Sequence, residues 1–264
     1  MLQLKQIHKV FNEGTADEKI AIDNISLSLN KGDFVTIVGS NGAGKSTLMN
    51  IISGKLQSDI GDILIHDQDV SAWSEQRRAS LIGRVFQDPM AGTSPHLTIE
   101  ENLAIAFNRT KKRTLAFGVT KKKRVFFKEQ LQQLQLGLEN RLDAKVGLLS
   151  GGERQALSLL MATFTEPSIL LLDEHTAALD PSRAERITEL TKEIVKRLNL
   201  TTLMVTHNMQ QALYLGNKLI MMDKGQIILQ VEEEEKKSLT IDTLLKEFQR
   251  IRGTQLANDR ALLV

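Results

Sequence analysis

Apolar and polar residues alternate along residues 1–35 with the period of two that half-buried strands show. Ile25, Leu27 and Leu29 alternate with the polar residues between them. A turn at 31–33 then leads into the apolar run 34–38, which predicts a buried strand. The N-terminal part of the chain is therefore expected to be strands.

The later pattern mixes buried strands with amphipathic helices. Short apolar runs predict strands at 63–65, 82–86, 169–174 and 202–205, and a hairpin over 218–231 with its turn at 223–226. Helical periodicity predicts helices over 47–53, 98–107, about 151–165, and from 180–182 onward, with a last amphipathic helix in the tail. A helix before Gly137 is expected to bury Val125, Phe126, Leu131 and Leu134. Buried strands flanked by helices predict an α/β fold with a mainly parallel sheet covered on both faces.

Composition narrows the class of protein. The 264 residues suffice for one large domain, and the net charge of +2 does not by itself indicate a nucleic-acid binder. The chain has no cysteine, which excludes a disulfide framework and a thiolate zinc site. No signal-peptide core or apolar run of about 20 residues occurs, so we expect a soluble chain whose membrane role, if any, depends on a partner.

A glycine-rich stretch links the strand 34–38 to the helix that ends before Gly54. It reads Gly39-Ser40-Asn41-Gly42-Ala43-Gly44-Lys45-Ser46-Thr47. Glycines allow consecutive backbone N–H groups to face a phosphate, and the helix start adds partial positive charge. Lys45 would reach the β- and γ-phosphates, and Ser46 would ligate Mg²⁺. The alternative is a flexible turn, but the strand and helix on either side favour a nucleoside triphosphate site.

The region 88–149 has a helical character and a basic segment. Thr98 and Glu101 are spaced as a capping box that opens the helix through Phe107. Eight basic residues lie between 109 and 124: Arg109, Lys111, Lys112, Arg113, Lys121, Lys122, Lys123 and Arg124. They form either a solvated face or a surface attracted to anionic lipid headgroups, and both interpretations stay open.

The second half carries further chemical groups at element ends. Leu149-Ser150-Gly151-Gly152-Glu153 opens a helix, and Ser150 and Glu153 are again spaced as a capping box. Asp173 and Glu174 end an apolar strand, Asp180 precedes a helix, and Gln87 and His207 each follow a strand. Taken singly, Glu174 could be a solvated acid and His207 an ordinary strand-end histidine.

In this order the motifs resemble those of the ATP-binding subunit of ABC transporters over essentially the whole chain. The resemblance implies a P-loop NTPase (RecA-like) core of 1–87 and 150–231 with an antiparallel β subdomain. It also implies an α-helical subdomain of 88–149 carrying the signature motif, and a helical tail of 232–264.

The resemblance also implies roles for single residues. The substrate would be ATP with Mg²⁺, the metal held by Ser46, Gln87 and Asp173. Glu174 would polarise the attacking water, assisted by His207 and Gln87. Phe11 resembles the aromatic residue that stacks on adenine, although a core position is an alternative.

The same resemblance implies an assembly. Ser150, Gly151 and Gly152 would bind the ATP held by a second copy, so that two chains enclose two ATP molecules and Asp180 links the sites. The expected partners are a transmembrane permease and, through it, an extracytoplasmic substrate-binding protein. The chain would lie at the cytoplasmic face of the membrane, and no nucleic acid is expected.

One position departs from the family pattern. His175 stands where most members carry proline, and it adds a group expected to titrate near neutrality but to take no part in catalysis. The wording Asp-Glu-His-Thr-Ala-Ala-Leu-Asp resembles a bacterial subgroup associated with aromatic amino-acid uptake. The leading hypothesis is an importer subunit, and a non-transport ABC ATPase or an exporter subunit are the alternatives.

Overall fold

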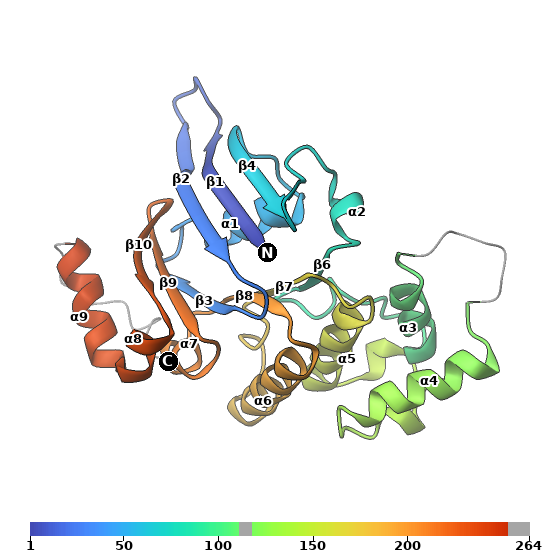
Figure 1. Cartoon of the computed structure of the whole chain (residues 1–264). Coiled ribbons are helices and arrows are strands. Elements are labelled where there is room, and N and C mark those ends of the chain that lie inside the picture. Colours follow the sequence, from blue (N-terminus) through green and yellow to red (C-terminus); the bar gives the residue numbers. More distant parts are fainter. Residues whose placement is uncertain (111–117, 253–264) are drawn as a thin grey trace. The chain divides into compact units, whose positions relative to one another are not determined.

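The computed structural model describes residues 1–110 and 118–252. The chain divides into two compact units. Their helices and strands are labelled in Figure 1. The first unit is Met1–Arg78 with Asn199–Val264, and the second is Ala79–Leu198. The subdomains that the resemblance implies, a core of 1–87 and 150–231 and a helical subdomain of 88–149, stay a prediction.

An antiparallel sheet forms the N-terminal part of the first unit. Its strands, in the order β2-β1-β4-β5, are β1 (Leu2–Phe11), β2 (Lys19–Leu29), β4 (Ile60–Ile65) and β5 (Gln68–Asp69). The short helix α2 (Glu75–Arg78) follows. Ile25, Leu27 and Leu29 are all at most 3% exposed, which confirms the predicted period-two pattern on β2.

The first unit also holds the strand that leads to the glycine-rich stretch. Strand β3 (Phe34–Gly39) is buried at every position and runs parallel to β8 (Thr201–Val205) and β9 (Lys218–Asp223). Strand β10 (Gln226–Val231) pairs antiparallel with β9 through the two-residue turn Lys224-Gly225, whose residues both have positive φ. Helix α1 (Lys45–Ser53) starts two residues earlier than predicted and ends at Gly54 in the left-handed conformation, as predicted.

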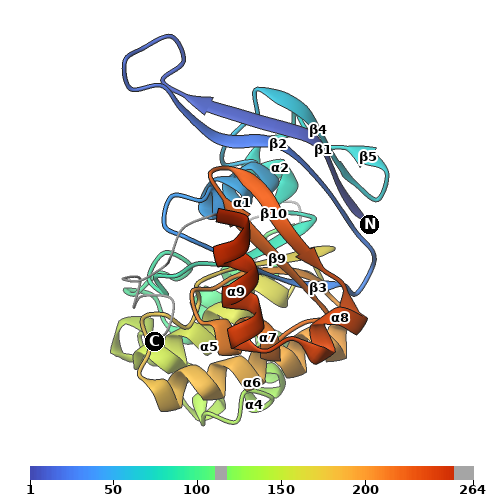
Figure 2. The same cartoon turned by 90° about the vertical axis from the view of Figure 1, so that its left-hand side faces the viewer.

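The last helices pack against this sheet. They are α7 (Met209–Tyr214), α8 (Glu233–Ser238) and α9 (Ile241–Arg252) (Figure 2). Leu244 of α9 joins a buried cluster whose other members come from β3, α7, β9 and β10: Val38, Met209, Ala212, Leu219, Met221 and Val231. The C-terminal helix is thus held to the sheet by apolar packing.

In the part of the second unit that the structure describes, two parallel strands lie with four helices. The strands are β6 (Ile82–Val85) and β7 (Ile169–Asp173). The helices are α3 (Ile99–Phe107), α4 (Lys121–Gln132), α5 (Gly151–Thr163) and α6 (Pro181–Leu198), with the 3-10 turns η1 (Leu138–Asn140) and η2 (Val146–Leu148). Four phenylalanine rings join α3, α4 and α5 with centroids 5.4 to 6.3 Å apart: Phe107, Phe126, Phe127 and Phe164.

The prediction for α4 is wrong at two points. Val125 is 59% exposed, whereas Phe127 is fully buried together with Leu131. Residues 127, 131 and 134 share one face at helical spacing, and Val125 lies about 200° away from Phe127 around the helix axis. The helix also ends at Gln132, because the chain turns there and Gly137 instead opens η1 in the left-handed conformation. Helix α5 likewise ends at Thr163, two residues before the predicted end.

Within the two described ranges, we find no helix that is both long and apolar enough to span a membrane.

Candidate nucleotide site

The glycine-rich loop in the first unit contains a position, Gly44, whose backbone only glycine fits. Gly44 has φ 98°, and a Cβ at this residue would lie 2.5 Å from the carbonyl oxygen of Ala21. Gly44 is also the N-cap of α1, where no side chain caps the helix and no acidic residue lies in the first turn. A helix start with a glycine N-cap and no acid in its first turn suits an anion.

The amine of Lys45 lies against the inner side of this loop. Lys45 is only 6% exposed, and its Nζ donates to the carbonyl oxygens of Gly39 at 2.7 Å and Ser40 at 3.0 Å. A buried ammonium beside a ring of backbone N–H groups provides the positive charge that a triphosphate requires.

Hydrogen bonds connect the β9–β10 hairpin to the glycine-rich loop. The Ser40 hydroxyl donates to Oδ1 of Asp223 at 3.1 Å, and the Gly225 N–H donates to the Ala43 carbonyl at 3.1 Å. Asp223 is 8% exposed and was not among the predicted site residues. An acid at the end of an apolar strand, just before a turn, was the sequence signal for it.

The remaining loop residues face outward to different degrees. Asn41, Gly42 and Ser46 are exposed, Thr47 is half-buried and Ala43 is buried. The exposed Ser46 hydroxyl lies in the first turn of α1, next to Lys45.

Phe11 ends β1 and is 37% exposed, so it is not a core residue. It pairs with Lys19 across the β1–β2 ladder, and the Lys9 ammonium lies 5.9 Å from its ring centroid. An exposed aromatic face of this kind is available for stacking on a base.

His207 follows β8 and is half-buried. The Thr206 N–H donates to the Ile37 carbonyl of β3, and the Thr206 hydroxyl donates to Gln211 of α7. Because β3 and β8 are parallel, His207 and the glycine-rich loop lie at the same edge of the sheet.

The carboxyl ends of β6 and β7 carry the predicted groups of the second unit. The two strands are parallel with Val85 beside Leu172, so the exposed Gln87 and the half-buried Asp173 lie beyond the same edge. The Arg84 guanidinium forms an ion pair with Asp173 at 3.1 Å, which sequence reasoning missed because only tertiary pairing of β6 and β7 reveals it.

The turn after β7 has an unusual backbone. Glu174 is half-buried with φ 44°, a left-handed conformation that a residue with a Cβ seldom adopts. His175 is 2% exposed, and burial lowers its pKa to about 4. The expectation that His175 titrates near neutrality is therefore wrong, because desolvation disfavours the charged imidazole.

The signature residues form the start of α5. Ser150 is the N-cap, its backbone N–H donates to Glu153 at 2.7 Å, and its hydroxyl accepts from the Glu153 N–H at 3.3 Å. The predicted capping box is thus confirmed, as is that of Thr98 and Glu101 on α3. Burial raises the pKa of Glu153, but the Ser150 hydrogen bonds and the Arg141 charge outweigh it and hold the pKa below its usual range.

The glycines and the acid that the resemblance assigns to the two-copy interface also lie in the second unit. Gly151 is half-buried and Gly152 is buried at the first positions of α5. Asp180 accepts a hydrogen bond from the Arg183 N–H at 3.1 Å and so caps α6, a role for which the sequence offered either Asp180 or Ser182.

Three of the described residues of the basic segment 109–124 form hydrogen bonds or ion pairs with other residues of the second unit. Arg109 donates to the Thr165 hydroxyl, Lys123 donates to the Gly118 carbonyl, and Arg124 pairs with Glu100 and Asp143. Lys121 and Lys122 are exposed at the start of α4, and Lys111, Lys112 and Arg113 lie outside the described residues.

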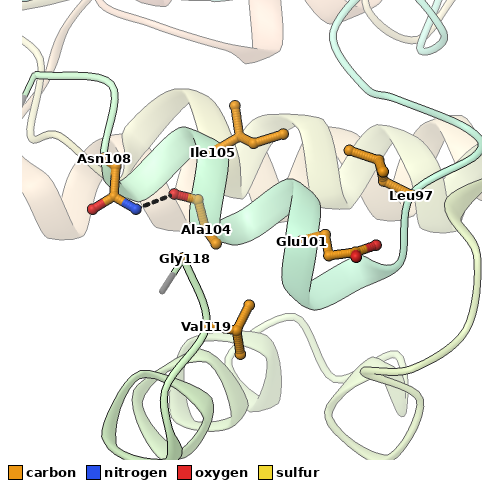
Figure 3. A pocket seen from close by; sticks show the side chains of 7 residues that line it. All are labelled: Leu97, Glu101, Ala104, Ile105, Asn108, Gly118 and Val119. Atoms are coloured by element: carbon orange, nitrogen blue, oxygen red, sulfur yellow. Dashed lines mark hydrogen bonds between the residues drawn. The ribbon is translucent and has the colours of Figure 1, made fainter. Parts of the chain in front are cut away.

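An open groove of about 590 Å³ lies along α3 (Figure 3). Its lining is mostly apolar and comprises Leu97, Glu101, Ala104, Ile105, Asn108, Gly118 and Val119. Ile105 is 59% exposed there, and Asn108 donates to the Ala104 carbonyl at 2.8 Å. The groove belongs entirely to the second unit.

The predicted metal ligands suit Mg²⁺ by their chemistry. Ser46, Gln87 and Asp173 offer a hydroxyl, an amide and a carboxylate oxygen, which are the hard donors that Mg²⁺ prefers. Residues 1–110 and 118–252 contain no group of three or more His, Cys, Asp or Glu side chains that could hold a metal ion.

The predicted residues thus form two groups. The glycine-rich loop, Phe11 and His207 lie in the first unit, whereas Gln87, Asp173, Glu174 and the signature lie in the second.

The amino-acid sequence was compared with known families and proteins. The ABC transporter family model matches residues 22–177. A tyrosine transport ATP-binding protein of Clostridioides difficile is 43% identical over 94% of this chain and 99% of its own length. A methionine import ATP-binding protein of Mannheimia succiniciproducens is 34% identical over 98% of this chain and 72% of its own length.

Solved structures agree with the sequence relatives. An ATP-binding cassette of an ABC transporter in its ADP conformation matches with a TM-score of 0.78 and 29% identity, over 97% of this chain and 99% of the other. A dimeric cassette in a post-hydrolysis state, bound to ADP and Pi, matches with a TM-score of 0.75 and 28% identity, over 88% and 98%. The chain therefore belongs to the ABC transporter family, as one of its ATP-hydrolysing cassettes.

Proposed function

We propose that this chain energises a bacterial ABC importer for aromatic amino acids by binding and hydrolysing ATP at the cytoplasmic face of the membrane. The observation that carries the proposal is the 43% identity, over nearly the full length of both chains, to a protein named for tyrosine transport. Relatives named for methionine and xylose/arabinose import support the direction of transport.

The first unit supplies the groups that bind the nucleotide. The loop 39–47 surrounds the phosphates with backbone N–H groups, Lys45 neutralises their charge, and Phe11 stacks on the base. Bound Mg²⁺ would neutralise the β- and γ-phosphate oxygens, with Ser46, Gln87 and Asp173 as its protein ligands.

The second unit supplies the group that acts on water. Glu174 accepts a proton from the attacking water, and a positioned base of this kind contributes about 10²–10⁴-fold in rate. Gln87 and His207 orient the water and the γ-phosphate. The Arg84 ion pair orients Asp173 at the end of β7.

Two copies of the chain act together. Ser150, Gly151 and Gly152 of each copy contact the ATP of the other, and Asp180 links the two sites. The dimeric cassette among the similar structures supports this arrangement. Closing the dimer drives the permease, and a shift from 1:99 to 99:1 between its two states needs about 5.5 kcal/mol of differential binding.

The groove along α3 receives the permease. It is open, it is mostly apolar and it presents Ile105 to solvent, as a surface that docks an apolar segment of a membrane subunit would. Through the permease the chain serves an extracytoplasmic substrate-binding protein. The exposed Lys121 and Lys122 can add attraction to anionic headgroups, at about 1 kcal/mol per residue, although a solvated face explains them equally well.

The docking surface has a matched control. Changing Ile105→Asp should abolish co-purification of the membrane subunit from detergent extracts. Ile60→Asp, at an apolar residue that is 63% exposed in the first unit, should leave the complex intact. Equal retention of the membrane subunit by both variants would exclude the groove as its docking surface.

Reconstitution tests the function as a whole. The tagged chain and the membrane subunit that co-purifies with it are placed in liposomes with the binding protein. ATP-dependent uptake of tyrosine or tryptophan is measured, with the Glu174→Gln variant as the control. We expect uptake with the unmodified chain and none with Glu174→Gln, which retains ATP and accumulates as a dimer.

Three results would contradict the proposal. Movement of substrate in the opposite direction identifies an exporter subunit. Uptake of a substrate other than an aromatic amino acid refutes the aromatic specificity. Purification with salt-sensitive bound nucleic acid in place of a membrane subunit identifies a non-transport ABC ATPase.

A further inference from the structure

A buried histidine lies immediately after the proposed catalytic base. The His175 side chain is 2% exposed, and its Nε2 lies 2.9 Å from the hydroxyl oxygen of Thr191, in the middle of α6. Thr191 is itself fully buried. The contact joins the turn after β7 to a helix residue sixteen positions further along the chain.

The direction of this hydrogen bond follows from the partners of Thr191. The Thr191 hydroxyl lies 2.7 Å from the Ile187 carbonyl oxygen, which can only accept. The single hydroxyl proton is therefore used toward Ile187, and the hydroxyl oxygen accepts from His175. His175 thus carries its proton on Nε2 and acts as the donor.

The turn that His175 anchors is strained. Glu174 has φ 44°, and a left-handed residue with a Cβ persists only where its surroundings hold it. Two backbone hydrogen bonds close the turn, from Ala177 to the Glu174 carbonyl at 3.0 Å and from Leu179 to the Thr176 carbonyl at 3.2 Å. Both are local to the turn, whereas the His175 bond ties it to a separate rigid element.

From this geometry we infer that His175 is a positioning residue for ATP hydrolysis: its hydrogen bond to Thr191 fixes the peptide beside Glu174 and thereby the direction of the Glu174 carboxylate. The inference rests on the proposed role of Glu174 as the base. His175 does not touch the substrate, and its effect passes through the backbone of its neighbour.

The first pair of variants changes Thr191, whose hydroxyl oxygen accepts the hydrogen bond from His175. Thr191→Val removes the hydroxyl at nearly constant volume, and Thr191→Ser retains it. We expect Thr191→Val to lower kcat for ATP hydrolysis about tenfold while KM for ATP stays unchanged, because a displaced base slows the chemical step without weakening nucleotide binding. Thr191→Ser should restore kcat.

The second pair changes the donor. His175→Gln carries an amide donor close to the position of Nε2, whereas His175→Leu fills the space without a donor. His175→Gln should retain more activity than His175→Leu. This pair tests the same bond if Thr191→Val fails to fold.

Thr163→Val is the matched control. Thr163 is a buried threonine on α5 whose hydroxyl donates to the carbonyls of Leu159 and Leu160. Its replacement removes a comparable hydroxyl from the same unit and should leave kcat unchanged. Urea unfolding of every variant separates lost stability from lost activity.

Glu174→Gln distinguishes the failure of this inference from the failure of the proposed function. In that background Thr191→Val should cause no further loss of kcat. If Glu174→Gln is inactive but Thr191→Val keeps its kcat and only unfolds at lower urea, His175 is purely structural and the inference is overturned. If Glu174→Gln hydrolyses ATP normally, the role of Glu174 is wrong and the inference falls with it.

Discussion

Glycines open two helices in this chain, and the backbone donors at the two helix starts are used differently. At α1 the N-cap is Gly44, with no side-chain cap and no acid in the first turn. At α5 the N-cap is Ser150, and a reciprocal pair of hydrogen bonds with Glu153 satisfies two donors. The α5 start is thus stabilised by a side-chain capping box, whereas the α1 start has neither a side-chain cap on its N-cap residue nor an acid in its first turn.

This difference in capping explains why two glycine-rich helix starts can have different roles. The α1 loop gains its charge from Lys45, which is buried against the loop carbonyls, and in the proposed function it binds phosphate within one chain. The start of α5 is already stable, with Arg141 at 2.7 Å from Glu153, and can present Ser150, Gly151 and Gly152 as a preformed surface to a second copy. Variants at the two helix starts test this contrast.

The largest expected effect is that of Lys45→Ala. It removes the buried ammonium from the loop, and we expect ATP affinity to fall about 100-fold, which corresponds to about 3 kcal/mol. Titration with a fluorescent ATP analogue measures the affinity. Lys31→Ala, at an exposed lysine that precedes β3, is the comparison for a general loss of charge. Equal affinity in Lys45→Ala and the unmodified chain would remove Lys45 from the site.

A pair of glycine variants separates the two helix starts next. Gly44→Ala brings a Cβ within 2.5 Å of the Ala21 carbonyl at a residue with positive φ, so we expect a destabilisation of about 1–3 kcal/mol together with lost ATP binding. Gly151→Ala meets only a Leu179 methyl group at 3.3 Å. It should keep ATP binding and stability while lowering hydrolysis by the dimer.

Unfolding in urea and ATP titration distinguish the two variants. Loss of ATP binding in Gly151→Ala would mean that the α5 start serves the nucleotide of its own chain. That result would refute the proposal that the α1 start serves the nucleotide of its own chain and the α5 start that of a second copy.

A smaller effect is expected from removing the α5 cap. Ser150→Ala should destabilise the chain by about 1 kcal/mol and lower hydrolysis. Thr98→Ala removes the other capping box of the same unit and should cost a similar stability with hydrolysis retained. If both variants hydrolyse ATP equally well, Ser150 serves only as a cap.

Local signals made much of this architecture predictable. The loop 39–47 between β3 and α1, both capping boxes and the 223–226 turn were each determined by residues close in sequence. The α5 start could be predicted because Ser150 and Glu153 stand at the fixed spacing of a capping box. Signals of that kind do not depend on how distant segments pack.

Tertiary packing determined what the sequence did not disclose. Arg84 reaches Asp173 only because β6 and β7 pair. Lys236 of α8 is buried, its amine donates to the backbone carbonyls of Leu215, Gly216 and Lys218, and burial lowers its pKa to about 8. Val125 was misassigned because its neighbour Phe127, with Leu131, marks the buried face of α4. The helical spacing of residues 127, 131 and 134 could have identified the buried face of α4 from the sequence.

The smallest predicted effect concerns pH and the charge of Glu153. Its pKa is held below the ordinary value of 4.5, so the charged cap contributes stability above about pH 4.5 and loses it as the pH falls through the native pKa. Glu153→Gln keeps the shape of the capping box but lacks the charge, and at pH 7 it should be less stable by about 1 kcal/mol or less. Urea midpoints of both proteins at pH 7, 5.5 and 4 should therefore converge toward the acid end. A gap that stays constant over this range would show that the charge of Glu153 does not stabilise α5, and that the two helix starts differ in geometry alone.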